Sequence, residues 1–391
     1  MKNTVTAMDF GTNKIVALVG ETNGRQGCDI VGAGFASYAG YSDGQWNDPA
    51  ALNMAISEAV HEAEKQGHTR IREVSVGVPG EFSRVYTVES KITLQGADPH
   101  VTVRNIEDLF RSAVEQLGQI RGVIIHRSPA WFMLDDGKKT LEPMGMRGTT
   151  LSALVSFVVA DQFFLDDISE RFRAMNIAVN SFISVPVSQA MLFVSDEERD
   201  RISVLVDVGY LNTEVMAIEG DALTFHRVIP MGGGNIAADL AYGLDIPLTS
   251  AETIKKTYVF GVSAGEEDFT VPDRDGVNKT FTRQEVSEVL EPRAEEIAEA
   301  VRDTIKGSGV RLGSASVVYM TGGGLVINRG AREFVSVILD RPVRELPRKT
   351  GKMSSPIYTS ALGVLDMTID TMVTANAGRG IKAFFSNLFG G

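Results

Sequence analysis

The stretch Asp9-Phe10-Gly11-Thr12-Asn13-Lys14 lies between two short apolar segments, at residues 4–8 and 14–20, which we predict to be strands. A polyphosphate nucleotide with hydrated Mg²⁺ is held by carboxylates that order the metal's water ligands and by N–H groups of Gly-rich turns. Asp9 is therefore a candidate for orienting Mg²⁺-bound water. Gly11, Thr12, Asn13 and Lys14 are candidates for phosphate contact. Taken alone, the stretch is equally compatible with an ordinary hairpin.

The same design returns in the second half of the chain. Asp207-Val208-Gly209 lies between apolar segments at residues 203–206 and 213–218, so both copies read strand, Asp, apolar residue, Gly, strand. Two copies predict a duplicated domain in which Asp207 and Gly209 face the first turn across a cleft. Helical periodicity alternates with the strands and makes the class α/β; it is found at residues 50–65, 106–117, 161–175, 234–242 and 283–305.

Three later segments complete a series suited to a nucleotide. Met231-Gly232-Gly233-Gly234-Asn235 leads into a helix, whose N–H groups and dipole favour an anion, so Gly233 and Gly234 are candidate contacts. Glu252 and Lys255 are one helical turn apart and can project together at a ribose or base, although such a pair is ordinarily a solvated ion pair. In Thr321-Gly322-Gly323-Gly324, which follows a strand, no glycine side chain blocks a flat adenine.

Composition narrows the function. The chain has 391 residues, enough for two domains, and 43% are hydrophobic. Its 50 acidic and 38 basic side chains give a net charge of −12, so nucleic acid is not an expected partner. Cys28 is the only cysteine, which fits a reducing cytoplasm, and no segment has the roughly 20 apolar residues needed to span a membrane. Four neighbouring side chains indicate a solvated helix face rather than a metal site: His61, Glu62, Glu64 and His68.

The ordered series resembles the actin, sugar-kinase and heat-shock ATPase superfamily, and within it most closely the bacterial cell-division family FtsA. The resemblance runs nearly end to end; it includes residues 9–20, Ala251-Glu252-Thr253-Ile254-Lys255, Leu290-Glu291-Pro292-Arg293 and the tail. It implies an actin-like ATPase fold, with two duplicated lobes around a nucleotide cleft and an FtsA-type inserted subdomain that MreB-type actins lack.

The expected domain boundaries follow from this resemblance and from the strand-rich stretch that begins near residue 82. The first lobe takes residues 1–81 and 161–200, the insertion 82–160, the second-lobe core 201–234 and 311–374, its small subdomain 235–310, a linker 375–378 and a terminal helix 379–391.

The resemblance also implies function. It implies ATP and Mg²⁺, the metal held through water by Asp9 and Asp207, and polymerisation with other copies of the chain. It implies capture of the acidic, apolar C-terminal peptide of FtsZ by the small subdomain, whose long helix carries Arg293 and Arg302. The expected location is the cytoplasmic face of the cell membrane at the division site.

The second phosphate turn departs from the family. FtsA and its relatives have Asp-x-Gly-Gly-Gly-Thr there, whereas this chain has Asp207-Val208-Gly209-Tyr210-Leu211-Asn212. Tyr210 and Leu211 disfavour positive φ and crowd the backbone's approach to a phosphate, while Asn212 can still hydrogen-bond. Either the nucleotide is held mainly by the first turn and the adenosine pocket, or binding is weakened and the fold is a scaffold.

Residues 185–189 contain no carboxylate to activate water, and we interpret Gln189 as structural. We therefore predict nucleotide binding rather than efficient hydrolysis and name no catalytic residue. Two rival functions stay open: a PilM-like cytoplasmic scaffold for envelope machinery, and an active ATPase or kinase of the same fold.

The last residues carry an amphipathic pattern. One helical face is apolar, formed by Ile381, Phe384, Phe385, Leu388 and Phe389. Arg379 and Lys382 suit anionic headgroups, and at about 1.5 Å per residue the helix is too short to span a bilayer. The alternative is a terminal helix docked on its own core. Because residues 375–378 separate the stripe from the last domain helix, we predict a peripheral membrane anchor.

Overall fold

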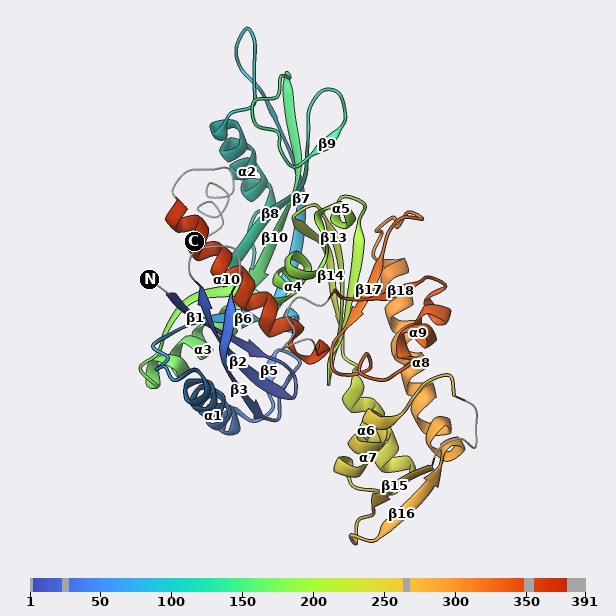
Figure 1. The fold of residues 1–391 in the computed structure, drawn as a ribbon. Coiled ribbons are helices and arrows are strands. Elements are labelled where there is room, and N and C mark those ends of the chain that lie inside the picture. The colour runs from blue at the N-terminus through green and yellow to red at the C-terminus, as the bar shows by residue number, and fades with distance from the viewer. Residues whose placement is uncertain (1–2, 23–27, 263–267, 348–354, 378–391) are drawn as a thin grey trace.

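The computed structural model describes residues 3–22, 28–262, 268–347 and 355–377, and it shows two lobes, each built on a five-stranded sheet (Figure 1). The predicted membrane-binding residues 379–391 lie outside this part of the chain, so the anchor stays a prediction. The predicted linker at residues 375–378 is wrong for residues 375–377, because the last helix, α10 (Thr359–Ala377), continues through them. Within the described ranges, no helix combines the length and apolarity that a membrane span requires.

The sheet of the first lobe has the order β11-β6-β1-β2-β3. Its strands are β1 (Asn3–Phe10), β2 (Lys14–Thr22), β3 (Asp29–Ser37), β6 (Glu73–Val78) and β11 (Ala178–Ser184). Helices α1 (Pro49–Gly67) and α3 (Gln162–Ala174) cover one face, and α4 (Val185–Phe193) and α10 (Thr359–Ala377) cover the other. Because both faces are covered, β1 and β2 are buried along most of their lengths, and residues 15–19 of β2 form an unbroken apolar run.

Local sequence explains the position of α1. Asp48 caps the helix by accepting hydrogen bonds from the N–H groups of Ala50 and Ala51, each at 3.0 Å, and Pro49 takes the first helical position. The helix then lies so close to β3 that a Cβ on Gly34 would stand 1.8 Å from the carbonyl oxygen of Ala59. Only glycine at this position permits that approach.

The inserted subdomain is a four-stranded sheet that projects from the first lobe (Figure 1). Its order is β7-β10-β8-β9, with β7 (Ser83–Thr93), β8 (Val123–Met133), β9 (Lys139–Thr140), β10 (Thr150–Ala160) and the covering helix α2 (Val103–Leu117). α2 begins with a capping box formed by Thr102 and Asn105. The base of the sheet contacts the second lobe, where Ser156 Oγ donates to the Leu223 carbonyl at 2.6 Å.

The second lobe repeats the first. Its sheet has the order β14-β13-β12-β17-β18, with β12 (Ser203–Val208), β13 (Thr213–Glu219), β14 (Ala222–Ile229), β17 (Val318–Thr321) and β18 (Val343–Glu345). β12 pairs antiparallel with β13 and parallel with β17, just as β1 pairs with β2 and β6. The two sheets thus share one design, and the predicted actin-like fold class is confirmed.

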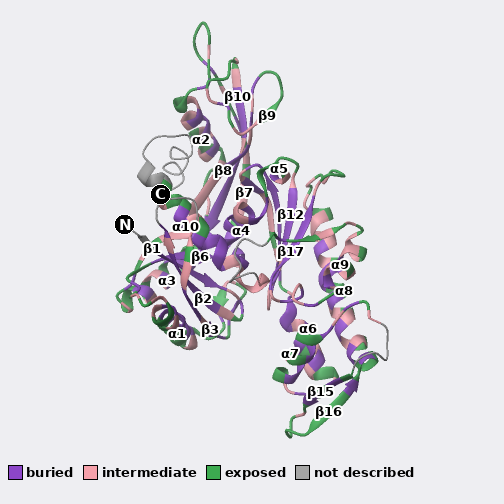
Figure 2. Ribbon diagram, viewed as in Figure 1, coloured by how far each residue is buried: buried purple, intermediate pink, exposed green. Residues whose placement is uncertain are grey.

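The small subdomain of the second lobe comprises α6 (Gly233–Gly243), α7 (Leu248–Thr257), β15 (Asp268–Pro272), β16 (Asn278–Thr282) and α8 (Arg283–Gly307). The remaining elements are β4 (Tyr41–Ser42), β5 (Gln45–Trp46), α5 (Asp196–Arg199), α9 (Ala331–Leu339) and two 3₁₀ turns, Gly80–Phe82 and Pro356–Tyr358. Figure 2 shows buried residues concentrated on the strands of both sheets and on the inward helix faces. In the first lobe this core includes a packed pair of rings, Phe82 and Phe164, with centroids 4.8 Å apart.

Candidate nucleotide-binding cleft

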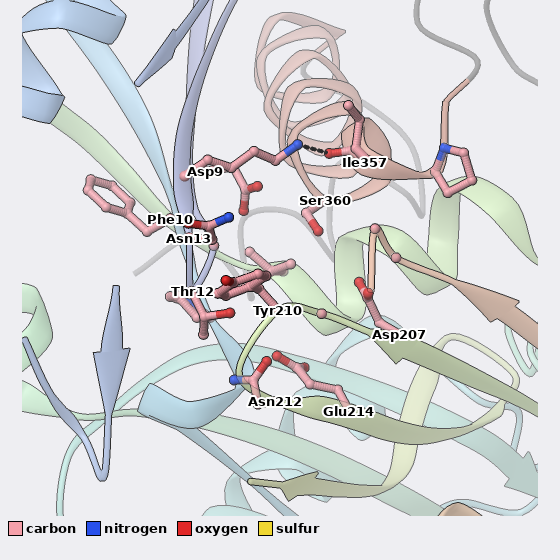
Figure 3. A pocket seen from close by; sticks show the side chains of 18 of the residues that line it. Asp9, Phe10, Thr12, Asn13, Asp207, Tyr210, Asn212, Glu214, Ile357 and Ser360 are labelled. Carbon is pink, nitrogen blue, oxygen red and sulfur yellow. Dashed lines mark hydrogen bonds between the residues drawn. The ribbon is translucent and has the colours of Figure 1, made fainter. Parts of the chain in front are cut away.

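A cavity of about 300 Å³ lies between the lobes, where β1 and β12 end. Twelve of the fifteen predicted nucleotide contacts line it: Asp9, Gly11, Thr12, Asn13, Lys14, Asp207, Gly209, Asn212, Glu252, Lys255, Gly322 and Gly323. Figure 3 shows Asp9 and Asp207 on its two walls, with the ring of Tyr210 pointing into it. Gly233, Gly234 and Gly324 are not among the lining residues.

The two aspartates occupy equivalent places and are both buried. Burial raises the pKa of Asp9 to about 7; the charge of Lys14 opposes the shift, and the charges of Asp207 and Glu214 add to it. Burial likewise raises the pKa of Asp207 to about 6, against the hydrogen bond from Gln189 Nε2 to Asp207 Oδ2 at 2.6 Å. Gln189 therefore holds Asp207, in keeping with its structural interpretation.

The two lysines of the cleft are already engaged. Lys14 Nζ donates to the Ile357 carbonyl at 2.8 Å, the bond drawn in Figure 3, and burial lowers its pKa. Lys255 Nζ lies 2.8 Å from Glu252 Oε1 and donates to the Gly233 carbonyl at 2.9 Å. Lys255 is only 2% exposed, so this pair is a buried anchor between α7 and α6 rather than the solvated pair that such spacing ordinarily forms.

The glycine runs pack the loops against one another. The N–H groups of Gly233, Gly234 and Gly324 donate to the carbonyls of Gly209 (2.9 Å), Tyr210 (2.6 Å) and Val208 (2.8 Å), respectively. A Cβ on Gly233 would stand 2.3 Å from the Gly324 oxygen, and a Cβ on Gly324 would stand 2.1 Å from the Gly209 oxygen, which explains why both positions are glycine. In this structure the three amides are directed at backbone carbonyls and not at the cavity.

Residues 209–212, hereafter the second loop, touch the first lobe directly. The Leu211 N–H donates to Thr12 Oγ1 at 3.0 Å, and Asn212 Nδ2 donates to Glu81 Oε2 at 3.3 Å. Just beyond the loop, Glu214 Oε1 accepts from the Gly80 N–H at 3.2 Å. We call these three bonds the interlobe bridge. As a result, the two predicted phosphate turns are in direct contact with each other.

Sequence reasoning missed part of the lining. The cleft is also lined by Phe10, Tyr41, Pro79, Val185, Tyr210, Glu214, Lys256, Ile327, Pro356, Ile357 and Ser360. Glu214 had a usable signal, because it is a lone carboxylate in the apolar segment 213–218. No local sequence pattern indicates Pro356, Ile357 and Ser360, because they reach the cleft only through the position of α10.

A magnesium ion bound through water suits the buried carboxylates. Asp9, Asp207 and Glu214 bring three acidic groups to the cleft, and because burial raises the pKa values of the two aspartates, a nearby cation would favour their ionised forms. The described residues contain no cluster of three or more side chains placed to ligate a metal directly. Carboxylate oxygens of this kind suit a hydrated Mg²⁺ ion.

The two predicted partner arginines both lie on α8 and are about a quarter exposed. Arg293 Nε donates to Asp239 Oδ2 at 2.6 Å and its Nη1 to Glu296 Oε2 at 2.5 Å. Arg302 pairs with Glu299 and Asp303, each at 3.1 Å. Both guanidinium groups thus have acidic partners within the lobe.

Comparisons with known proteins agree with this architecture. The family model "Cell division protein FtsA" matches residues 204–363. The chain is 26% identical to cell division protein FtsA of Pseudomonas aeruginosa, over 92% of this chain and 88% of that protein. It is 23% identical to FtsA of Escherichia coli K12, over 97% and 96%.

Solved structures show the same fold at low identity. A PilM–PilN type IV pilus biogenesis complex matches with a TM-score of 0.65 at 17% identity, covering 93% of this chain and 98% of that one. MreB 5 of Spiroplasma citri, solved with AMPPNP, matches with a TM-score of 0.53 at 14% identity, covering 96% and 98%.

The duplicated sheets and the cleft between them define a two-lobed protein with an actin-like fold. In sequence the chain is similar to cell division protein FtsA over most of its length, in agreement with the resemblance of its motifs.

Proposed function

We propose that this chain is a membrane-tethered, actin-like cell-division adaptor that binds ATP with Mg²⁺, self-assembles, and anchors FtsZ polymers to the inner face of the cell membrane. The observation that carries the proposal is the matched pair Asp9 and Asp207, at equivalent strand ends facing one cleft, in a chain related to FtsA. MreB 5 of Spiroplasma citri, a structural neighbour, was solved with AMPPNP, which supports a nucleotide as the ligand.

In this proposal the nucleotide is a structural ligand. The interlobe bridge already joins the lobes. The amide nitrogen of Gln189 is occupied, because it donates a hydrogen bond to Asp207. Asp9 and Asp207 would hold the hydrated metal, and Glu252 and Lys255 would flank the nucleoside. Mg²⁺ would neutralise the phosphate charge beside these carboxylates. By contacting both lobes, the ligand would then reinforce the interlobe bridge rather than serve as a substrate.

The tail would tether the protein weakly. Burying five large apolar side chains contributes roughly 8–12 kcal/mol before the comparable cost of ordering about ten residues. A single tail is therefore expected to bind reversibly, whereas several tails on one polymer gain avidity. Membrane residence would then depend on self-assembly.

We expect Phe384→Glu/Phe389→Glu to abolish pelleting with vesicles that contain phosphatidylglycerol, as deletion of residues 379–391 should. The control Ser386→Glu/Asn387→Glu adds the same charge to the polar face. Cosedimentation should show it near wild type, because its apolar stripe is intact. If both double variants pellet equally well, the amphipathic anchor is ruled out.

We expect a synthetic FtsZ C-terminal peptide to bind the purified chain, and Arg293→Gln to weaken binding about tenfold by removing a partner for the acidic peptide. Fluorescence anisotropy measures the affinity, with Arg311→Gln, an exposed arginine outside α8, as the control. Absence of peptide binding in the wild-type chain would favour the PilM-like scaffold instead.

A further inference from the structure

A second pocket, of about 490 Å³, lies in the first lobe, away from the cleft. It is formed by the last turns of α1, the segment before β6 and the turn between α3 and β11. Because β6 and β11 run parallel to β1, their starts lie at the edge of the sheet opposite Asp9. We call this site the lobe-edge pocket.

Its rim is basic. Arg70 and Arg72 are both exposed, and in the described part of the chain neither guanidinium group has an ion pair or a hydrogen bond. Many other arginines are paired, such as Arg171 with Asp167 at 2.7 Å. In a chain of net charge −12, two unpaired guanidinium groups at one pocket are a concentrated positive site.

The other polar groups fit the same ligand. His61 adds a ring that can donate a hydrogen bond. Glu64 is the one carboxylate among the lining residues, and its Oε1 accepts the Ile71 N–H at 2.8 Å, so it is turned toward the backbone. His61 and Glu64, which the sequence places on a solvated helix face, therefore lie beside two arginines rather than beside further metal ligands.

The floor of the pocket strengthens its attraction for anions. Val60, Ile71 and Ile177 line it and are 4–7% exposed. Apolar groups beneath a charged rim lower the local dielectric, which makes the interaction of an anion with the arginines stronger than at an open surface. Arginine presents paired N–H donors that match the oxygens of a phosphate.

The position of the pocket in the first lobe suggests which molecule could carry the phosphate group. α10 begins at the cleft, where Ser360 lines the cavity, and crosses the sheet against β1, β2 and β6. It ends at Ala377, on the same side of the first lobe as the start of β1 (Figure 1). The predicted anchor, residues 379–391, follows this end of α10 in the sequence.

We propose that the lobe-edge pocket binds a phosphate group, through Arg70, Arg72 and His61. The group can belong to an anionic lipid headgroup or to a free phosphate ester. The lipid source rests on the membrane tether proposed above, whereas the phosphate chemistry itself does not depend on it.

The chemistry is tested on the full chain by following the ring signals of His61 by NMR during titration with inorganic phosphate and glycerol 3-phosphate. A saturable shift is expected in the wild type and in the control Arg201→Gln/Arg311→Gln, and its loss in Arg70→Gln/Arg72→Gln. The control removes two exposed arginines from the second lobe, so the net charge is matched. The proposal is overturned if the wild type shows no saturable shift, or if the pocket variant keeps it.

The source is tested with vesicles of phosphatidylcholine with and without phosphatidylglycerol. If the pocket takes headgroups, Arg70→Gln/Arg72→Gln should lower binding to the anionic vesicles roughly tenfold relative to the control. Equal binding of the two variants, with the phosphate shift lost only in the pocket variant, assigns a free phosphate instead. Phe384→Glu/Phe389→Glu separates the tether from the pocket, since it should abolish vesicle binding and leave the phosphate shift intact.

Discussion

Replacing Tyr210-Leu211-Asn212 with Gly-Gly-Thr is expected to raise the affinity of the chain for Mg·ATP by at least about tenfold. In the present loop the Leu211 N–H is bound to Thr12 Oγ1. The Tyr210 ring packs against Gly234 and lies 5.2 Å from Lys255 Nζ. Glycines would permit positive φ, so that backbone N–H groups of the loop, including the one at residue 211, can turn toward the phosphates. A tenfold gain corresponds to about 1.4 kcal/mol, a reasonable value for one or two new hydrogen bonds.

Titration calorimetry at fixed Mg²⁺ measures this effect. Glu81→Ala separates two causes, because it breaks the Asn212–Glu81 bond of the interlobe bridge without restoring the glycines or removing a predicted nucleotide contact. Tyr242→Ala, at an exposed tyrosine of α6, controls for loss of an aromatic ring elsewhere in the lobe. An affinity that is unchanged or lower in the loop variant would show that the second loop does not limit nucleotide binding.

The lobes and their strands were predictable because they rest on local patterns. The predicted helix at residues 283–305 is observed as α8, Arg283–Gly307, and it begins at a capping box of Thr282 and Glu285. The duplicated strand pairs were visible because buried strands of this kind are continuous apolar runs next to a turn. In these cases residues that are close in the sequence are enough to predict the element.

The interlobe bridge was not predictable, because it joins residues far apart in the chain. Nothing near Leu211 indicates that its N–H meets Thr12, and no local pattern turns Glu81 toward Asn212. The reason for a glycine at position 233 was also not visible in the sequence, because the atom that excludes a side chain there belongs to Gly324, which is distant in the chain. The lobe-edge pocket arises in the same way, from three segments that only the sheet brings together.

In the absence of nucleotide and Mg²⁺, Asp9→Asn is expected to stabilise the chain by about 2–4 kcal/mol at pH 8. The folded-state pKa of Asp9 is about 7, above the ordinary value of 3.8, chiefly because the carboxyl is buried. The folded state therefore binds the proton more tightly than the unfolded state. Its contribution to stability is fully present below pH 4 and is lost as the pH rises to 7. Asp207, with a pKa of about 6, acts in the same direction.

Urea denaturation at pH 5.5 and pH 8 with a chelator present measures the difference. The wild-type chain should be less stable at pH 8, and Asp9→Asn should flatten much of this dependence, leaving the part due to Asp207. Asp275→Asn, at an exposed aspartate of the β15–β16 turn, should keep the wild-type profile. Mg·ATP should then stabilise the wild type more than Asp9→Asn, because the cation compensates a buried charge that the variant lacks. A variant that is less stable than wild type at pH 8 would mean that the ionised Asp9 stabilises the empty cleft, contrary to its burial.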